Sequence, residues 1–261
     1  MVPEHLYHYT KGNAAPSIIS GGCDTDKEIC FWLKNASQKN DFHELLLGER
    51  LVNGLKCYMR DHGRSSVINE VDINPNLVYI NSFTENDIPT DHMLKEYGRF
   101  RLEFNLRGFR SDGDIGECTY FGENDIDSMI DYYRDSFDKY WLEISRDNDT
   151  IALGNYILGE LSAFVSIPFL KFRDKWVNEL EWRHVFHQQD GDGRVFIHKD
   201  GFPRMRVFYP AAALVGITCY WDEKDFEDEL SFYQLIFDRI HNQGWNTSVR
   251  LVHLSKNANV L

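Results

Sequence analysis

The chain has 261 residues, of which 43% are hydrophobic and 26% are charged, a composition typical of folded globular proteins. Its 41 acidic residues outnumber its 28 Lys and Arg residues, which gives a formal net charge of −13. This balance excludes a broad basic face for non-specific nucleic-acid binding, although a local basic groove is still allowed. The odd number of cysteines, five without a C-x-x-C pair, disfavours a disulfide framework and a thiolate zinc site.

No targeting or anchoring pattern stands out in the sequence. The first residues lack the apolar run of a signal peptide, and the longest apolar stretch, Ala211 to Ile217, is too short to span a bilayer. Internal repeats, low-complexity tracts and Pro/Gly/Ser-rich linkers are also missing. We therefore expect one domain over residues 1–261, located in the cytoplasm and without a membrane partner.

Hydrophobic periodicity predicts the elements of the first half of the chain. An aromatic strand at Leu6–Thr10 precedes a short helix at Pro16–Ser20, and a longer helix runs from about Asp41 to His62. Alternating strands follow at Val78–Thr84 and Phe100–Leu106.

Two helices are expected between Gly122 and Pro168, where apolar residues recur at helical spacing. Further strands are predicted at Trp176–His187, Val195–His198, Met205–Phe208 and Leu214–Tyr220. A helix over about Glu223–Asn242 and a strand at Ser248–Leu254 close the chain. Because strands and helices are mixed without strict βαβ alternation, the predicted fold class is α+β.

The segment from Glu179 to Arg183 carries the most specific local pattern. On a strand, Glu179, Glu181 and Arg183 would share one face, because residues two apart point the same way. Two carboxylates beside a guanidinium can hold one acid ionised and poise the other for proton transfer. A solvated strand face with an ordinary ion pair is the alternative interpretation.

Other polar patterns have simpler explanations. Asp41 and Glu44 fit a capping box that opens a helix, although carboxylates there could also bind a metal. His184 and His187, three apart on a strand, would point to opposite faces and would not chelate zinc. A lone His8 in an aromatic strand is typical of a buried, hydrogen-bonded histidine. Motifs of Rossmann, P-loop, α/β-hydrolase and zincin proteins are missing, and no metal is expected.

Taken together, the motifs resemble a large bacterial family known as a domain of unknown function and often found near phage-defence genes. They are listed here in chain order: L-Y-H-Y-T at residues 6–10, N-D-F-H-E at 40–44, S-F-T-E at 82–85, M-L-K-E-Y-G at 93–98 and W-V-N-E-L-E-W-R at 176–183. The resemblance covers nearly the whole chain.

The same order of motifs is similar to that of the ADP-ribosyltransferase superfamily. This second resemblance implies a split mixed or antiparallel sheet with flanking helices, and NAD as the substrate. It assigns NAD binding to the first-strand residues His8, Tyr9 and Thr10, with His8 on the nicotinamide ribose. Ser82 would match the serine of the second motif, and Tyr97 would pack on the nicotinamide ring.

The late E-x-E motif matches the catalytic position of the superfamily. Glu181 would be the catalytic glutamate, with Glu179 as the carboxylate that orients the acceptor. Cleavage of the nicotinamide–ribose bond passes through an oxocarbenium-like state, which a fixed carboxylate stabilises more strongly than the ground state. Glu179 could accept a proton from the attacking nucleophile.

The resulting hypothesis is an NAD-dependent ADP-ribosyltransferase, a bacterial toxin or phage-defence effector that modifies a protein or a nucleic acid. An antitoxin or regulatory protein is a further expected partner. Four arginines could form a local phosphate track: Arg99, Arg101, Arg107 and Arg110.

Three alternatives stay open. The first is an NAD glycohydrolase, which has water as its acceptor. The second is a metal-dependent nuclease built on Asp41, Glu44, Glu179 and Glu181. The third is a non-catalytic interaction module.

Overall fold

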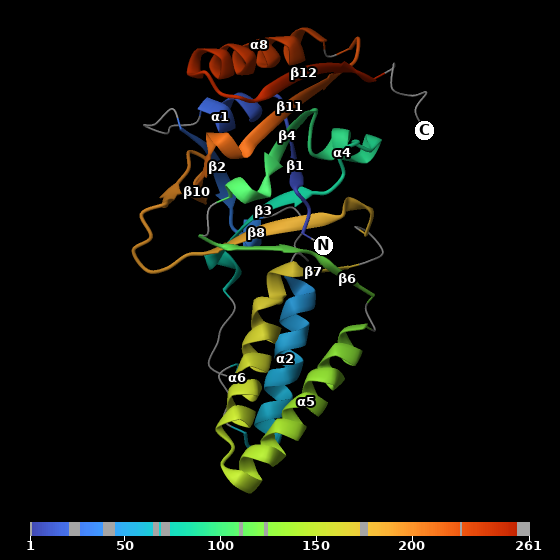
Figure 1. The fold of residues 1–261 in the computed structure, drawn as a ribbon, viewed down its shortest axis with the longest axis vertical. Helices are drawn as coiled ribbons and strands as arrows, with labels where there is room; N and C mark the ends of the chain where they lie inside the picture. The colour runs from blue at the N-terminus through green and yellow to red at the C-terminus, as the bar shows by residue number, and fades with distance from the viewer. Residues whose placement is uncertain are drawn as a thin grey trace. The chain divides into compact units, whose positions relative to one another are not determined.

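The chain is α+β and forms two compact units in the computed structural model (Figure 1). The first unit comprises Met1–Lys34, Tyr79–Ile115 and Glu179–Leu261, and the second comprises Asn35–Val78 and Gly116–Asn178. The structure describes residues 2–20, 27–38, 45–64, 68, 74–109, 112–122, 125–172, 177–224 and 226–254.

A seven-stranded mixed sheet dominates the first unit, with the strand order β12-β11-β4-β1-β3-β8-β5. Strand β1 pairs antiparallel with both β3 and β4, β11 pairs antiparallel with β4, and β12 runs parallel to β11. The strand bounds are β1 His5–Thr10, β3 Val78–Thr84, β4 Phe100–Asn105, β5 Asp114–Glu117, β8 Glu181–His187, β11 Leu214–Trp221 and β12 Ser248–His253.

A smaller antiparallel sheet packs against one face of the large sheet. It has the order β2-β10-β9, with bounds Glu28–Lys34, Pro203–Pro210 and Val195–Ile197. The core between the sheets is aromatic: the ring centroid of Phe31 lies 6.0 Å from that of Phe104 and 5.4 Å from that of Tyr209. Burial of such rings supplies much of the driving force for folding.

Three α-helices of the described residues accompany these sheets. Helix α1 (Ala15–Ser20) and the long helix α8 (Phe226–Gln243) lie together near β11 and β12, and both place isoleucines in the core (Figure 1). The short helix α4 (Asp91–Glu96) belongs to the other face of the large sheet, where its Met93 packs with Tyr9 and Tyr220.

The two faces of the large sheet differ in chemistry because side chains alternate along each strand. Leu6 of β1 and Phe83 of β3 point into the aromatic core, together with Trp182 of β8. Their strand neighbours therefore point to the opposite face, which we call the polar face. Along β8 these are Glu181 and Arg183.

The second unit consists of a helical hairpin, a third helix that packs against it, and a two-stranded parallel sheet. Helices α2 (Leu46–Asp61), α5 (Asp125–Asp147) and α6 (Thr150–Val165) lie side by side (Figure 1), and β6 (Thr119–Phe121) pairs with β7 (Leu170–Phe172). Helix α2 buries one stripe that ends in Tyr58 and Met59. Gly48 lets α2 approach the chain after α6, because an added Cβ would lie 2.4 Å from the Cα of Ile167.

Most of the expected elements are confirmed, with shifts of a few residues at their ends. Four strands and a helix of the described residues were not predicted: β2, β5, β6, β7 and α4. The expected strand at Trp176–His187 is wrong in its first part, because β8 begins only at Glu181. The expected start of α2 near Asp41 lies outside the described residues. No helix in the described part of the chain is long and apolar enough to cross a bilayer.

Candidate active site

The end of β3 and the start of β8 meet at a corner where loop backbone and strand side chains are bonded together. The Thr84 hydroxyl donates a hydrogen bond to the carbonyl oxygen of Glu179 at 2.5 Å, and the Asn86 side-chain amide donates to the same oxygen at 3.3 Å. The backbone N–H of Glu85 donates to the carbonyl of Leu180 at 3.2 Å. The chain is therefore fixed immediately before Glu181.

The two glutamates of the E-x-E motif do not lie on one strand, which corrects the prediction that they share a strand face. Glu179 ends a 3-10 turn, Val177–Glu179, and Leu180 adopts a left-handed conformation with φ 44°. Such a conformation is costly for a leucine and is kept only where surrounding contacts impose it. The corner supplies those contacts through Thr84, Asn86 and Glu85.

Glu181 lies at the start of β8 in a buried ion pair with Arg183. The Arg183 Nε donates to Glu181 Oε1 at 2.9 Å, and the two side chains are 0% and 6% exposed. The i, i+2 spacing predicted this shared face correctly. The guanidinium of Arg183 supplies an opposite charge beside the buried carboxylate, which offsets part of the cost of burying it.

Tyr97 reaches the same corner from the other side. It follows helix α4, which begins after Thr90, whose hydroxyl accepts a hydrogen bond from the N–H of Met93 at 3.2 Å. The Tyr97 hydroxyl donates to Glu179 Oε1. Tyr97 is exposed and Glu179 is half-buried, so the Glu179 carboxylate is accessible, whereas Glu181 is buried.

Gly98 explains how Tyr97 arrives there. Its φ is +120°, and an added Cβ would lie 2.4 Å from the carbonyl carbon and oxygen of Thr10. Only glycine tolerates both the dihedral angle and this approach. The chain can therefore pass directly against the end of β1 before it enters β4.

His8 does not join the other predicted NAD ligands. Its ring contacts Phe31 and Phe83 at centroid distances of 5.0 and 5.8 Å, which places it on the aromatic-core face. Its Nδ1 bonds to the backbone carbonyl of Ser82 at 2.9 Å, whereas the Ser82 side chain alternates to the polar face with Glu181. His8 and Ser82 therefore point to opposite faces of the sheet, and of these two residues only Ser82 shares the polar face with Glu181.

The remaining first-strand residues also divide between the two faces. Tyr9 lies on the polar face, where its hydroxyl donates to the Asn86 carbonyl at 3.2 Å and burial raises its pKa. Thr10 pairs with Phe100 of β4, a residue of the aromatic core, and so takes the same face as His8. Of the predicted set, the structure brings Tyr9, Tyr97, Glu179 and Glu181 to the corner.

Sequence reasoning missed Asn86 as a site residue. It bonds through its backbone N–H to the Thr84 hydroxyl at 3.0 Å and through its side chain to the Glu179 carbonyl. A short polar run directly after a strand was the signal that could have found it, because such residues often bind neighbouring backbone groups.

The arginines expected to bind phosphate and the carboxylates expected to bind a metal are the remaining predicted site residues. Arg99 bonds to Asp222 at 2.7 Å, and Arg101 stacks on Tyr7 with its Cζ 4.8 Å from the ring centroid. Arg99 and Arg101 are therefore engaged within the protein, and Arg110 of the same predicted phosphate track lies outside the described residues. Of the metal-site carboxylates, Asp41 and Glu44 lie outside the described residues. Within the described ranges, no group of three or more His, Cys, Asp or Glu residues could hold a metal ion.

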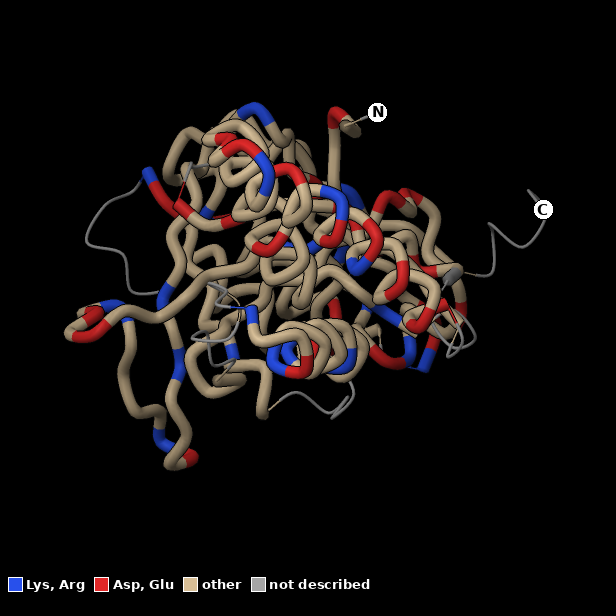
Figure 2. Tube along the Cα trace, turned by 90° about the horizontal axis from the view of Figure 1, so that it is seen from below, with Lys and Arg blue, Asp and Glu red and all other residues tan. Residues whose placement is uncertain are grey.

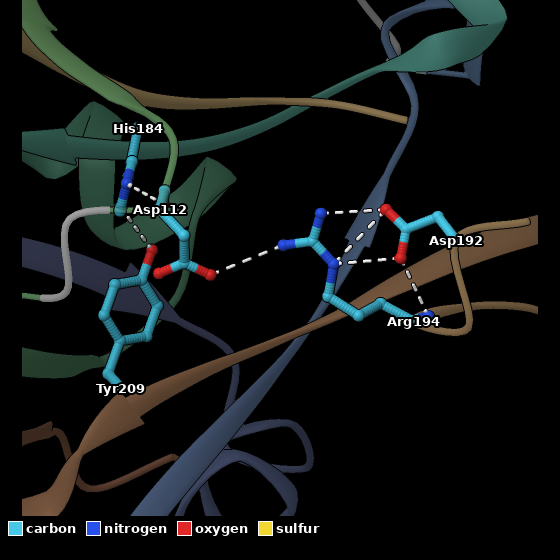
Figure 3. A network of polar contacts seen from close by, with 5 residues as sticks. All are labelled: Asp112, His184, Asp192, Arg194 and Tyr209. Carbon is cyan, nitrogen blue, oxygen red and sulfur yellow. Dashed lines mark hydrogen bonds and ion pairs between the residues drawn. The ribbon is translucent and has the colours of Figure 1, made fainter. Parts of the chain in front are cut away.

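A second polar network lies on the aromatic-core face and centres on His184 (Figure 3). Its Nε2 contacts the carbonyl oxygen of Asp112 at 3.0 Å, and its Nδ1 contacts the Tyr209 hydroxyl at 3.0 Å. A carbonyl oxygen only accepts, so Nε2 carries the proton and Tyr209 donates to Nδ1. The Asn81 amide donates to the Tyr209 oxygen at 3.2 Å and completes the chain.

This network keeps His184 neutral. Burial lowers the pKa of His184 to about 4. The hydrogen bond to Asp112 raises this pKa, but it offsets only part of the effect of burial. Asp112 also contacts Arg194, which is bonded to Asp192 at 2.8 Å (Figure 3). A neutral histidine with both nitrogens engaged is a structural element, and we assign it no chemistry.

Comparisons with protein-family models, curated proteins and solved structures found no match for this chain.

Proposed function

We propose that the chain is an NAD-dependent ADP-ribosyltransferase of the ADP-ribosyltransferase-like fold, with Glu181 as its catalytic carboxylate. The observation that supports this proposal is the corner itself. A buried, ion-paired Glu181 lies two residues from an accessible Glu179 that accepts a hydrogen bond from Tyr97. Two carboxylates with different surroundings can take different roles in one reaction.

The chemistry assigns a role to each group. Glu181, paired with Arg183, stabilises positive charge that develops on the ribose as nicotinamide leaves. Glu179 accepts the proton of the attacking nucleophile, and the Tyr97 hydroxyl fixes the direction of its carboxylate. The exposed Tyr97 ring supplies a surface on which a nicotinamide ring can pack.

Tyr9 and Ser82 share the polar face with Glu181 and remain in the proposed NAD site. His8 and Thr10 do not share that face, so the proposal gives them a structural role at the end of β1. The toxin or phage-defence role, the neutralising partner and the macromolecular acceptor belong to the same proposal.

The experiment is incubation of the purified protein with radiolabelled NAD and a bacterial lysate, either untreated or treated beforehand with nuclease or protease. We expect label in macromolecules, lost in Glu181→Gln and retained in Glu227→Gln, which removes an exposed acid on α8. The treatment that abolishes labelling identifies the acceptor class. Release of nicotinamide without label would instead identify an NAD glycohydrolase.

A second variant protects the test against misfolding. Tyr97→Phe removes one exposed hydroxyl, so its thermal unfolding should match that of the wild type while its turnover falls roughly ten-fold. Wild-type turnover in Glu181→Gln, or wild-type protein that neither labels macromolecules nor releases nicotinamide, would refute the proposal.

A further inference from the structure

The smaller sheet of the first unit has an outward face that the proposed reaction does not use. Along β2, Phe31 and Leu33 point into the core, so Trp32 and Lys34 point away from it. Across the ladder, Trp32 pairs with Arg206 of β10. Phe196 of β9 pairs with Arg204 and takes the same side, because paired residues in antiparallel strands point to one face.

Aromatic side chains form the centre of this outward face. The Trp32 side chain is 48% exposed although it lies in the middle of a paired strand. Phe196 and His198 contact its ring edge to face, at centroid distances of 5.4 and 5.6 Å. The two contacts hold the indole at the surface, where an exposed tryptophan is unusual for a side chain with so much apolar area.

Positive charge surrounds these rings. Arg206 lies over Phe196 with its Cζ 4.5 Å from the ring centroid, and Lys34 is exposed on the neighbouring strand. Among the described residues, no carboxylate forms an ion pair with Arg206 or Lys34. The nearby acid Asp200 is bonded to Arg204 at 2.6 Å and contacts His198 at 3.1 Å.

The local charge of the outward face is therefore opposite to that of the whole chain, whose formal net charge is −13. Figure 2 shows acidic residues over much of the trace, with Lys and Arg positions recurring along the strands at its left. The composition excluded a broad basic surface but allowed a small one. A small cationic surface built around aromatic rings suits a ligand that combines planar rings with anions.

We propose that this outward face binds single-stranded nucleic acid. A base stacks on the Trp32 ring, and Arg206 and Lys34 contact the phosphates on either side of it. Sheet faces that present aromatic rings and cations bind single strands in this way, because every unpaired base offers a ring face and every nucleotide a negative charge. Duplex DNA hides its base faces, so the outward face favours single strands.

The inference is independent of the proposed transferase activity and is tested without NAD. Fluorescence anisotropy of a fluorescein-labelled twelve-residue oligothymidylate would be followed as the full-length protein is added at low salt. We expect a dissociation constant in the micromolar range. Trp32→Ala should weaken binding about five-fold or more, since one stacked base contributes about 1–3 kcal/mol.

The charged contacts have a separate signature. Two phosphate contacts on a single strand predict a slope of about −1.4 for log K against log salt, and Arg206→Gln or Lys34→Gln should each reduce it by about 0.7. Matched controls are Tyr132→Ala and Lys139→Gln, an exposed aromatic and an exposed cation on helix α5. Both controls should bind as the wild type does.

Three results would overturn the inference. The first is no change in anisotropy with the wild-type protein, which would leave the outward face to a protein partner. The second is equal affinity for a duplex of the same length. The third is wild-type affinity in Trp32→Ala, whose folding is checked by thermal unfolding.

Discussion

His184 makes the stability of the first unit depend on pH in a direction that can be calculated. An exposed histidine in the unfolded chain has a pKa of about 6.5, whereas burial lowers the pKa of His184 to about 4. Between these values the unfolded chain binds a proton that the folded protein does not. The free energy of unfolding therefore falls as the pH decreases through this window, and is unaffected by His184 above it.

The size of the effect follows from the same two pKa values. The full difference corresponds to about 3 kcal/mol, reached below about pH 4, and about 2 kcal/mol of it is lost between pH 7 and pH 5. The relevant contact is the hydrogen bond that Nδ1 accepts from the Tyr209 hydroxyl, because a protonated Nδ1 can no longer accept it, whereas the Nε2–H donation to Asp112 persists.

The assay is urea unfolding followed by tryptophan fluorescence at several pH values, for the wild type and for His184→Gln. Glutamine retains one donor and one acceptor but does not titrate. Since all other titrating groups are shared, the difference between the two pH profiles isolates His184. The variant should lose about 2 kcal/mol less than the wild type between pH 7 and pH 5. Parallel profiles, or a His184 that titrates near its ordinary pKa by NMR, would refute the reasoning.

Two further predictions concern the corner at the start of β8. Gly98→Ala should lower the free energy of unfolding by at least about 2 kcal/mol, because the added Cβ meets both an unfavourable φ of +120° and a contact to Thr10. The control is Gly191→Ala, where φ is +75° but the space around the Cβ is open. It should cost only about 1 kcal/mol in the same chemical unfolding assay. Similar losses in both variants would mean that the contact is unimportant. Arg183→Met should cost about 3–5 kcal/mol by removing the guanidinium from beside the buried Glu181 carboxylate, and adding Glu181→Gln should restore part of the loss. A double variant no more stable than Arg183→Met would contradict this account.

The elements that the sequence predicted best are those whose pattern reflects burial directly. Strand β4 was found because Phe100, Leu102 and Phe104 alternate with polar residues and face the core. Strand β2 was missed because it carries apolar side chains on both faces, Trp32 included, which removes the alternation. Helix α4 has only six residues and depends on its Thr90 cap and on Met93 packing against Tyr9.

The candidate site was predictable in part. The pairing of Glu181 with Arg183 follows from strand periodicity alone, and the structure confirms it. The departure of Glu179 from that strand could not be predicted, because leucine has no preference for the left-handed conformation of Leu180. Long-range hydrogen bonds from Thr84 and Asn86 impose it. The separation of His8 from Ser82 likewise depends on the pairing register of β1 with β3, which a single sequence does not contain.

The chain of hydrogen bonds through Asn81, Tyr209 and His184 has a consequence for how this protein can diverge. Its members come from β3, β10 and β8, so it joins the large sheet to the small one. Each hydrogen bond in it has a fixed donor and a fixed acceptor. Loss of any member leaves a buried donor or acceptor unsatisfied in a neighbour that belongs to a different strand. Substitutions at these three positions should therefore be accepted together or not at all, and relatives of this chain should show them varying as a group.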